Sequence, residues 1–318
     1  MRANCRRQLS VGERLMRILL FGGEGQVGWE LRRALSVLGQ LVVPARKPGE
    51  GGDLGDLEGL RQTIRRHCPD VVVNAAAYTD VPAAEHERAR AFAINALAPE
   101  AMAQEAARCG ALMVHYSTDY VYDGQSDDAY SETDVAQPLN VYGESKFDGD
   151  RRVMASGCDY LIFRTSWVYS VRGKNFLTTM LKLLRERDRL TVVDDQRGAP
   201  TSAELLADVT AHAVARTYPD RALCGLYHLT ASGATSWYGY SCLIADLLRE
   251  RSAGQVIDDA AIVPVTAAVY GSEVLRPKNS CLNTSRLEKA FDLELPDWTT
   301  GVIRVVDEGL YFEKRRQL

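Results

Sequence analysis

An apolar run that leads directly into a glycine-rich turn restricts this sequence more than any other feature. Arg17–Phe21 has the pattern of a buried strand, Gly22, Gly25 and Gly28 follow at three-residue intervals, and a helical pattern covers Trp29–Leu38. Glycines in such a turn permit the bend, let backbone N–H groups approach a pyrophosphate and allow close helix packing. The segment predicts the opening of a dinucleotide-binding fold, although glycine turns between a strand and a helix also serve purely structural needs.

Strand and helix patterns alternate after this opening. Further strands are expected at Gln40–Pro44, Val71–Asn74, Leu112–Tyr116 and Tyr160–Arg164, with helices at Leu57–His67 and Ala91–Arg108. Val71–Asn74 is almost wholly apolar, as a central parallel strand is when both faces are covered. The alternation predicts an α/β fold built on a doubly wound parallel sheet, which binds its ligand at the carboxyl ends of the strands.

The pattern loosens after residue 170, which indicates a second lobe. We expect a Rossmann-type NAD(P)-binding domain over residues 16–170, with later strands near 190–193 and 225–230 returning to its sheet. Residues 171–318 are expected to form mostly a smaller C-terminal α/β substrate lobe. The polar, arginine-rich residues 1–15 are expected to be a disordered extension, and translation from Met16 is the alternative.

Composition excludes several classes of protein. A formal net charge of -4 provides no basic field, so no nucleic acid polymer is expected as a partner. The seven cysteines are scattered and form no C-x-x-C pair, which favours reduced thiols over a disulfide framework or a zinc site. No apolar run is long enough to span a bilayer and no hydrophobic signal core is present, so we expect a cytoplasmic protein without membrane attachment.

Tyr142 and Lys146 are four residues apart, which places them on one face of a helix, one turn from each other. A free tyrosine titrates near ~10, and a neighbouring ammonium group stabilises the phenolate and brings its pKa within reach of neutral pH. The pair is a candidate acid/base catalyst. The alternative is an amphipathic helix with a surface lysine and a half-buried tyrosine. Thr118 at the end of the fourth strand completes a Ser/Thr, Tyr, Lys set typical of short-chain dehydrogenases/reductases.

The end of the second strand bears on the choice of cofactor. An acidic residue there accepts hydrogen bonds from the adenosine ribose of NAD, whereas a cation suits the extra phosphate of NADP. The acid is missing here, and Arg46 and Lys47 follow the strand. The sequence favours NADPH over NADH, and two ordinary basic surface residues are the alternative interpretation.

Six ordered segments carry a closer resemblance. They are Phe21–Gly22 with Gly25–Leu31, then Asn74–Ala77, Tyr116–Val121, Leu139–Lys146, Phe163–Tyr169 and Asp195–Thr201. Together they resemble the dTDP-4-dehydrorhamnose reductase family of extended short-chain dehydrogenases/reductases, from Met16 nearly to the C-terminus. The resemblance implies reduction of the 4-keto group of dTDP-4-dehydro-β-L-rhamnose by NADPH or NADH, the last step of dTDP-rhamnose biosynthesis.

The resemblance also implies roles for individual residues. Tyr142 protonates the developing alkoxide, Lys146 lowers the pKa of Tyr142 and holds the nicotinamide ribose, and Thr118 hydrogen-bonds the carbonyl oxygen. Asp119 and Trp167 join Thr118 in contacting the sugar nucleotide; from the residues alone, Asp119 is a turn residue and Trp167 a core residue. The expected cofactor-binding residues are Gly22, Gly25, Gln26, Val27, Gly28, Arg46, Asp53, Leu54, Ala75, Ala76, Ala77, Thr79, Tyr116, Tyr142 and Lys146.

Some members of the family form dimers with magnesium held by acidic side chains at the interface. Glu30, Glu204 and Glu308 stand where those acids are expected, and carboxylates suit a hard cation. The resemblance therefore suggests a homodimer with Mg²⁺, and three solvated helix-surface glutamates are the equally weighted alternative.

Two other functions remain open from the sequence. One is another sugar-nucleotide enzyme of the same superfamily, namely a 4-epimerase, a 4,6-dehydratase or a sibling 4-ketoreductase. The other is a non-catalytic regulatory subunit, like the relative that regulates methionine adenosyltransferase. The presence of Thr118, Tyr142 and Lys146 argues against the second.

Overall fold

The computed structural model describes residues 15–47, 49–251 and 256–316, which group into two compact units. The first unit holds the described residues up to Thr118 with Val141–Arg164 and Ala207–Tyr227; the second holds Asp119–Asn140, Thr165–Leu206 and the described residues from His228 onward. The sequence predicts a domain over residues 16–170, with strands near 190–193 and 225–230 returning to its sheet. The first unit differs from that range because it leaves out Asp119–Asn140 and takes in Ala207–Tyr227. The predicted disordered extension, except Leu15, lies outside the described residues.

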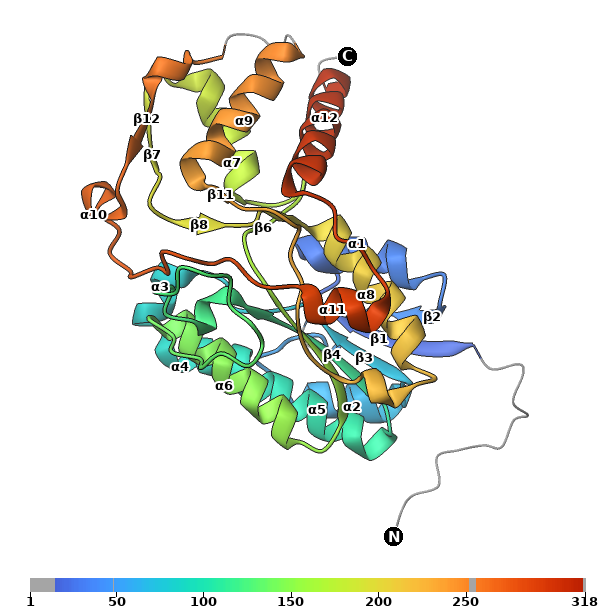
Figure 1. The fold of residues 1–318 in the computed structure, drawn as a ribbon. Helices are drawn as coiled ribbons and strands as arrows, with labels where there is room; N and C mark the ends of the chain where they lie inside the picture. The colour runs from blue at the N-terminus through green and yellow to red at the C-terminus, as the bar shows by residue number, and fades with distance from the viewer. Residues whose placement is uncertain (1–14, 48, 252–255, 317–318) are drawn as a thin grey trace. The chain divides into compact units, whose positions relative to one another are not determined.

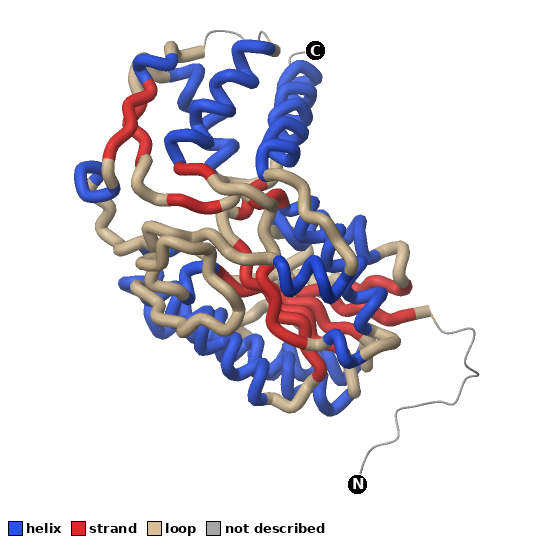
Figure 2. The backbone as a smooth tube through the Cα atoms, in the orientation of Figure 1, coloured by secondary structure: helices blue, strands red, loops and turns tan. Residues whose placement is uncertain are grey.

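A six-stranded sheet in the order β10-β5-β4-β3-β1-β2 forms the centre of the first unit (Figures 1 and 2). Its strands are β1 (Met16–Phe21), β2 (Gly39–Val42), β3 (Val71–Asn74), β4 (Leu112–Thr118), β5 (Asp159–Thr165) and β10 (Gly225–His228). β1 pairs in parallel with β2 and β3, and β3 pairs in parallel with β4. Every residue of β3 and β4 is buried, as in strands covered on both faces. The predicted α/β fold with a doubly wound parallel sheet is confirmed.

Helices cover both faces of this sheet. Figure 1 shows α1 (Gln26–Leu35) and α8 (Ala203–Thr217) on one face, with α2 (Leu57–His67), α5 (Ala98–Cys109) and α6 (Val141–Ala155) on the other. Between β3 and α5 the chain forms α3 (Val81–His86), α4 (Arg88–Phe92) and a π-helical turn at Ala93–Leu97. The strand order reverses at β1, so the carboxyl ends of β1 and β3 mark the switch point at which doubly wound folds bind ligands.

The helix α2 shows how local sequence sets these elements. The Asp56 side chain accepts a hydrogen bond from the Gly59 N–H and caps the first turn, while Cys68 ends the helix in the left-handed conformation. Leu60 and Ile64, four residues apart, are buried on the sheet-facing side. The helix begins and ends where the sequence predicts.

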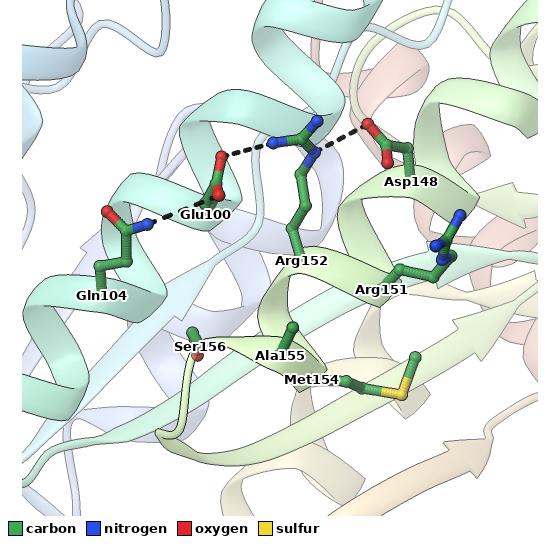
Figure 3. Close-up of a pocket in the computed structure, with 8 residues that line it drawn as sticks. All are labelled: Glu100, Gln104, Asp148, Arg151, Arg152, Met154, Ala155 and Ser156. Atoms are coloured by element: carbon green, nitrogen blue, oxygen red, sulfur yellow. Dashed lines mark hydrogen bonds and ion pairs between the residues drawn. The ribbon is translucent and has the colours of Figure 1, made fainter.

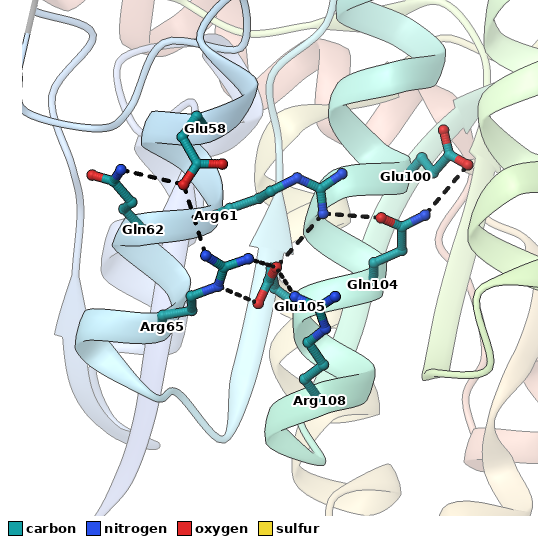
Figure 4. A network of polar contacts seen from close by, with 8 residues as sticks. All are labelled: Glu58, Arg61, Gln62, Arg65, Glu100, Gln104, Glu105 and Arg108. Atoms are coloured by element: carbon teal, nitrogen blue, oxygen red, sulfur yellow. Dashed lines mark hydrogen bonds and ion pairs between the residues drawn. The ribbon is translucent and has the colours of Figure 1, made fainter. Parts of the chain in front are cut away.

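A buried carboxylate fastens α2 to α5. The Glu105 side chain is fully buried and lies 2.6 Å from Arg65, 2.8 Å from Arg108 and 3.6 Å from Arg61 (Figure 4). Burial acts to raise the pKa of the Glu105 carboxyl, but the three guanidinium groups outweigh burial and the pKa is lowered. This cluster therefore serves helix packing, and none of the predicted site residues belongs to it.

The second unit has its own core. Helices α7 (Phe176–Glu186), α9 (Trp237–Glu250) and α12 (Trp298–Arg316) pack around Leu184, Ile244 and Val305, which are almost completely buried. Its shorter elements are β6 (Val168–Tyr169), β8 (Arg197–Gly198), β9 (Thr201–Ser202), β11 (Thr235–Ser236), α10 (Ala267–Tyr270) and α11 (Ser285–Phe291). No helix in the described ranges has both the length and the apolar character that crossing a membrane requires.

The predicted return of residues 190–193 to the main sheet is wrong. That strand, β7 (Leu190–Val193), pairs in parallel with β12 (Ile262–Val265) in a separate two-stranded sheet. Of its four residues only Val192 is buried, and Val192 packs in the core of the second unit. An apolar tetrapeptide alone does not specify its partner strand, whereas the later strand Gly225–His228 does join the main sheet next to β5.

Candidate active site

The turn after β1 brings three backbone segments into close contact. Gly22 has a φ of +80°, and a Cβ placed on it would lie 2.7 Å from the Ala75 carbonyl carbon and 2.7 Å from the Ala76 nitrogen. A Cβ on Gly28 would lie 2.0 Å from the Gly22 oxygen. Both positions therefore require glycine, because any side chain would force β1, the loop after β3 and α1 apart.

The first turn of α1 is suited to an anion. Gly25 is the N-cap, no side chain caps the helix at this end, and no acidic residue occupies the first turn. Gln26 and Val27 are the first two helical residues. A helix N-terminus presents backbone N–H donors and the positive end of the helix dipole, so this turn fits the pyrophosphate of a dinucleotide.

The loops after β2 and β3 hold the other residues expected to line the cofactor. Arg46 Nε lies 3.8 Å from Asp53 Oδ1; the Arg46 side chain is largely exposed and Asp53 is half-buried. Leu54 is buried, Ala75, Ala76 and Ala77 are half-buried after the end of β3, and Thr79 is exposed. The structure therefore brings an exposed cation and a carboxylate together beyond β2, next to the strand ends where Rossmann folds bind adenosine.

The three expected catalytic residues belong to two neighbouring elements of the first unit. Thr118 is the last residue of β4 and is 5% exposed, whereas Tyr142 and Lys146 lie in the first two turns of α6. Lys146 is 2% exposed, and its Nζ donates a hydrogen bond of 2.5 Å to the Tyr116 backbone oxygen. The alternative of a surface lysine is therefore wrong, because this ammonium group is buried against β4.

Burial changes the acidity of Lys146. The loss of water lowers the pKa of the Lys146 ammonium from 10.5 to about 8, and attraction from Asp150 opposes the decrease. Burial raises the pKa of the Tyr116 phenol, so this side chain stays neutral. Its hydroxyl shares a hydrogen bond of 2.6 Å with Thr210 Oγ1. Tyr116 thus meets Lys146 through its backbone and α8 through its side chain.

Asn95, which sequence reasoning missed, connects the catalytic helix to the loop after β3. It lies in the π-helical turn, and its Nδ2 donates to the Tyr78 carbonyl oxygen at 3.0 Å and to Ser145 Oγ at 3.0 Å. Ser145 in turn donates to the Tyr142 carbonyl oxygen at 2.8 Å. A buried asparagine in a π-turn is a feature often found near functional sites, and periodicity analysis cannot detect such a turn.

Trp167 and Asp119 lie in the second unit. Trp167 has a φ of +48°, an uncommon conformation for a bulky residue, and its ring stacks on Trp237 with centroids 3.5 Å apart and planes 8° apart. A Cβ on Gly198 would lie 2.6 Å from the Trp167 ring, so the ring is enclosed on that side as well. Asp119 is 3% exposed at the start of a short 3₁₀ turn. Sequence analysis did not predict that Trp237 supports Trp167, because the two residues are 70 positions apart and their rings stack only in the folded protein.

The three glutamates expected to hold magnesium do not form a metal site within one chain. Glu204 Oε2 lies 2.8 Å from Arg304 Nε, and Glu30 Oε2 lies 3.4 Å from Arg33 Nε. Across the described residues no group of three His, Cys, Asp or Glu side chains could hold a metal ion. Two of the carboxylates are already compensated by arginines, so the set does not fit a divalent cation in the single chain.

A surface hollow lies between α5 and the end of α6, the helix that also carries Tyr142 and Lys146. It is lined by Glu100, Gln104, Asp148, Arg151, Arg152, Met154, Ala155 and Ser156 (Figure 3). Arg152 lies at its centre and contacts Glu100 at 2.7 Å and Asp148 at 2.8 Å. Arg152 thus pairs with two of the lining carboxylates, and none of the lining residues is a predicted cofactor or substrate residue.

Comparison with known proteins places this geometry among related chains. Residues 16–310 match the protein family described as RmlD substrate binding domain. The chain is 49% identical over 296 residues to the dTDP-4-dehydrorhamnose reductase of Escherichia coli strain K12, covering 92% of this chain and 98% of that protein. It is 46% identical over 291 residues to the dTDP-4-dehydrorhamnose reductase of Burkholderia thailandensis, covering 90% of this chain and 97% of that protein.

Solved structures agree with the sequence relatives. The crystal structure of the dTDP-4-dehydrorhamnose reductase from Bacillus anthracis, in complex with NADP, superposes with a TM-score of 0.83 at 30% sequence identity. The match covers 92% of this chain and 99% of that one. The similarity therefore extends through both compact units and is not limited to the nucleotide-binding sheet.

Proposed function

This chain belongs to the dTDP-4-dehydrorhamnose reductase family, and from that premise we propose that it reduces the 4-keto group of dTDP-4-dehydro-β-L-rhamnose to give dTDP-β-L-rhamnose. The observation that carries the proposal is the buried Lys146, held on β4 one helical turn from Tyr142. Burying a lysine ammonium group carries a high desolvation penalty, and ionisable groups buried in this way are concentrated at functional sites.

The first unit suits a pyridine nucleotide. Gly25, Gln26 and Val27 would hold the pyrophosphate at the N-terminus of α1, and Arg46 would face the 2′-phosphate of NADPH. When bound, the reduced nicotinamide supplies the hydride that the carbonyl carbon accepts. NADPH is therefore the expected cofactor, with NADH as the second donor.

Tyr142 acts as the proton donor. As the carbonyl carbon gains the hydride, negative charge grows on the carbonyl oxygen, and the Tyr142 hydroxyl transfers its proton to that oxygen. Lys146 in its cationic form stabilises the tyrosinate that remains, and Thr118 donates a hydrogen bond to the oxygen as its charge develops. Asn95 and Ser145 keep the first turn of α6 in place, so Tyr142 does not have to be ordered during the reaction.

The second unit supplies the residues proposed for the sugar nucleotide. The Trp167 ring is fixed by its stack on Trp237, and Asp119 follows Thr118 directly in the chain. A rigid aromatic surface loses little entropy when it packs against a ligand. We therefore assign Trp167 and Asp119, with Thr118, to recognition of the dTDP-sugar.

An NADPH oxidation assay with enzymatically prepared dTDP-4-keto-6-deoxy sugar tests this function. We expect substrate-dependent loss of NADPH absorbance and formation of dTDP-rhamnose, identified by chromatography against a standard. Purified protein that carries tightly bound NAD and interconverts sugar epimers would instead indicate an epimerase. Absence of turnover with every 4-keto sugar would favour a non-catalytic regulatory subunit.

The remaining expectations concern assembly and location. We propose a homodimer only as a state to be tested by sizing chromatography with and without a chelator. An unchanged elution profile on chelation would agree with the arginine pairing of Glu30 and Glu204, which leaves no metal requirement in the single chain. We also propose a cytoplasmic location, which fractionation of cells tests.

A further inference from the structure

Asp150 is a buried carboxylate that the mechanism above does not use. It lies four residues after Lys146, so Tyr142, Lys146 and Asp150 occupy one face of α6 in successive turns. Its side chain has no solvent exposure. Oδ2 accepts a hydrogen bond of 2.8 Å from Ser117 Oγ and another of 3.2 Å from Arg164 Nε. A carboxylate buried to this depth is expected to have a partner or a task.

The charged and titratable groups around Asp150 come from three elements. β5 contributes the guanidinium group of Arg164, whose Nε lies 3.2 Å from Asp150 Oδ2. β4 contributes His115, whose Nε2 lies 3.9 Å from Asp150 Oδ1; burial, and then repulsion from Lys146, hold the pKa of His115 well below its ordinary value, so the imidazole is neutral. α6 itself contributes Lys146. Burial raises the pKa of the Asp150 carboxyl, and the charges of Arg164 and Lys146, together with the hydrogen bonds from Ser117 and Arg164, oppose that rise. With these two cations and a neutral imidazole around it, Asp150 is the anion of the cluster.

We propose that Asp150 is a positioning residue of the reductase reaction: its buried carboxylate, fixed by Ser117 and Arg164, keeps Lys146 protonated and thereby acts on Tyr142. This inference rests on the proposed function for its catalytic consequence. The interaction between Asp150 and Lys146 is electrostatic, and the carboxylate is assigned no contact with substrate or cofactor.

Two opposing effects explain why Lys146 needs this partner. Burial alone drives an ammonium group toward its neutral form, and a neutral amine neither stabilises a tyrosinate nor attracts it. Attraction from Asp150 works in the opposite direction and holds the pKa of Lys146 near 8. A unit charge one helical turn away, at an effective dielectric constant of about 20, changes a pKa by about one pH unit or more. Without Asp150, Lys146 would lose much of its charge at neutral pH.

A purely structural role for Asp150 makes a different prediction. In that case the carboxylate only joins α6 to β4 and β5 through Ser117 and Arg164, and its removal destabilises the protein without changing the titration of Lys146. The two roles are therefore separated by the protonation of Lys146 and not by the loss of activity.

The experiment measures that protonation directly in the full-length protein without nucleotide. The chain has seven lysines, so Cε-¹³C lysine labelling gives a simple NMR spectrum, in which the Lys146 signal is identified by its absence in Lys146→Met. We expect Asp150→Asn to lower the midpoint of the Lys146 titration by about one pH unit or more. The alkaline limb of the kcat profile for NADPH-dependent reduction should move to lower pH by a similar amount.

Asp148→Asn is the matched control. Asp148 lies on the same helix, carries the same charge and pairs with Arg152 at 2.8 Å on the partly exposed side. We expect its removal to leave the Lys146 titration and the kcat profile unchanged. If Asp148→Asn moved the Lys146 titration as far as Asp150→Asn, any negative charge on α6 would have the same effect. The specific role of Asp150 would then be rejected.

A second variant covers the case in which Asp150→Asn does not fold. The Ser117 hydrogen bond lowers the pKa of the Asp150 carboxyl, so Ser117→Ala should raise that pKa and weaken the anion while its pair with Arg164 remains. The Lys146 midpoint should therefore fall by a smaller amount than in Asp150→Asn. An unchanged Lys146 midpoint in a folded variant overturns the inference, even if wild-type protein reduces the 4-keto sugar. An inactive wild type would instead refute the proposed function, and the NMR titration would still report on Asp150.

Discussion

The Lys146 ammonium group donates a 2.5 Å hydrogen bond to the backbone oxygen of Tyr116, two residues before the end of β4. This bond fixes the lysine against the strand that ends in Thr118, and the helix then places Tyr142 one turn away. Tyr142, Lys146 and Thr118 are therefore positioned by one strand–helix contact, as the proposed proton transfer requires.

Replacement of Tyr142 by phenylalanine should remove the proton donor while keeping the ring. We expect kcat to fall on the order of a hundredfold or more, because proton transfer by a positioned side chain contributes that much. NADPH affinity, measured by fluorescence titration, should fall by less than kcat, because Tyr142 is also an expected cofactor contact. Tyr311→Phe, on the exposed side of α12, is the control and should keep wild-type turnover. Near-normal turnover of Tyr142→Phe would contradict the mechanism.

Replacement of Lys146 by methionine should stabilise the protein at pH 7. The folded-state pKa of about 8 lies below the ordinary value of 10.5, so the folded protein carries a desolvation penalty while the lysine is protonated. Since the unfolded chain binds more protons between these values, wild-type stability rises as the pH increases through this interval. Removing the charge should add roughly 1 to 3 kcal/mol to the free energy of unfolding at pH 7, after the lost hydrogen bond is allowed for.

Urea denaturation at pH 7 and pH 10 measures this effect. The difference between Lys146→Met and wild type should shrink at the higher pH, and the variant should have lost its reductase activity. Lys182→Met, at an exposed position on α7, should change stability by less than about 0.5 kcal/mol at either pH. A variant at position 146 that is less stable than wild type at pH 7 would show that burial is not the dominant influence on Lys146.

Arg46 should determine the preference between the two nucleotides. Its exposed guanidinium lies in the loop after β2, 3.8 Å from Asp53. An exposed guanidinium at this position can pair with the 2′-phosphate of NADPH. We expect Arg46→Ala to lower kcat/KM for NADPH about tenfold and to leave kcat/KM for NADH nearly unchanged, a loss of about 1.4 kcal/mol of transition-state binding. Arg66→Ala, at an exposed position on α2, serves as the control. Equal losses with both nucleotides would reject a role in phosphate recognition.

Gly28 should tolerate no side chain. A Cβ there would lie 2.0 Å from the Gly22 oxygen, so Gly28→Ala must push α1 away from the turn. Overpacking of this kind destabilises by about 1 to 3 kcal/mol and should weaken NADPH binding as well. Gly309→Ala in α12 places its Cβ 3.5 Å from the nearest atom, so it should be neutral or stabilising by up to about 1 kcal/mol. Thermal unfolding and nucleotide titration of both variants measure the contrast.

Sequence reasoning located the elements that local patterns define. The buried run before Gly22, the helix Leu57–His67 and the strand Val71–Asn74 occur where the periodicity places them. It failed at Leu190–Val193, because an apolar tetrapeptide pairs with whichever strand the fold brings beside it. It also missed the π-turn that carries Asn95, since that turn differs from an α-helix only in its hydrogen bonds.

The sequence alone determined that Tyr142 and Lys146 share a helix face, because a spacing of four residues is a property of the local backbone. Only the tertiary structure decided that Lys146 is buried and that Ser117 and Arg164 hold Asp150 beside it. Those side chains come from β4, β5 and α6, and their contacts exist only after the sheet and the helix have packed. Desolvation and charge pairing depend on that packing, so the acidity of the site cannot be derived from residue spacing.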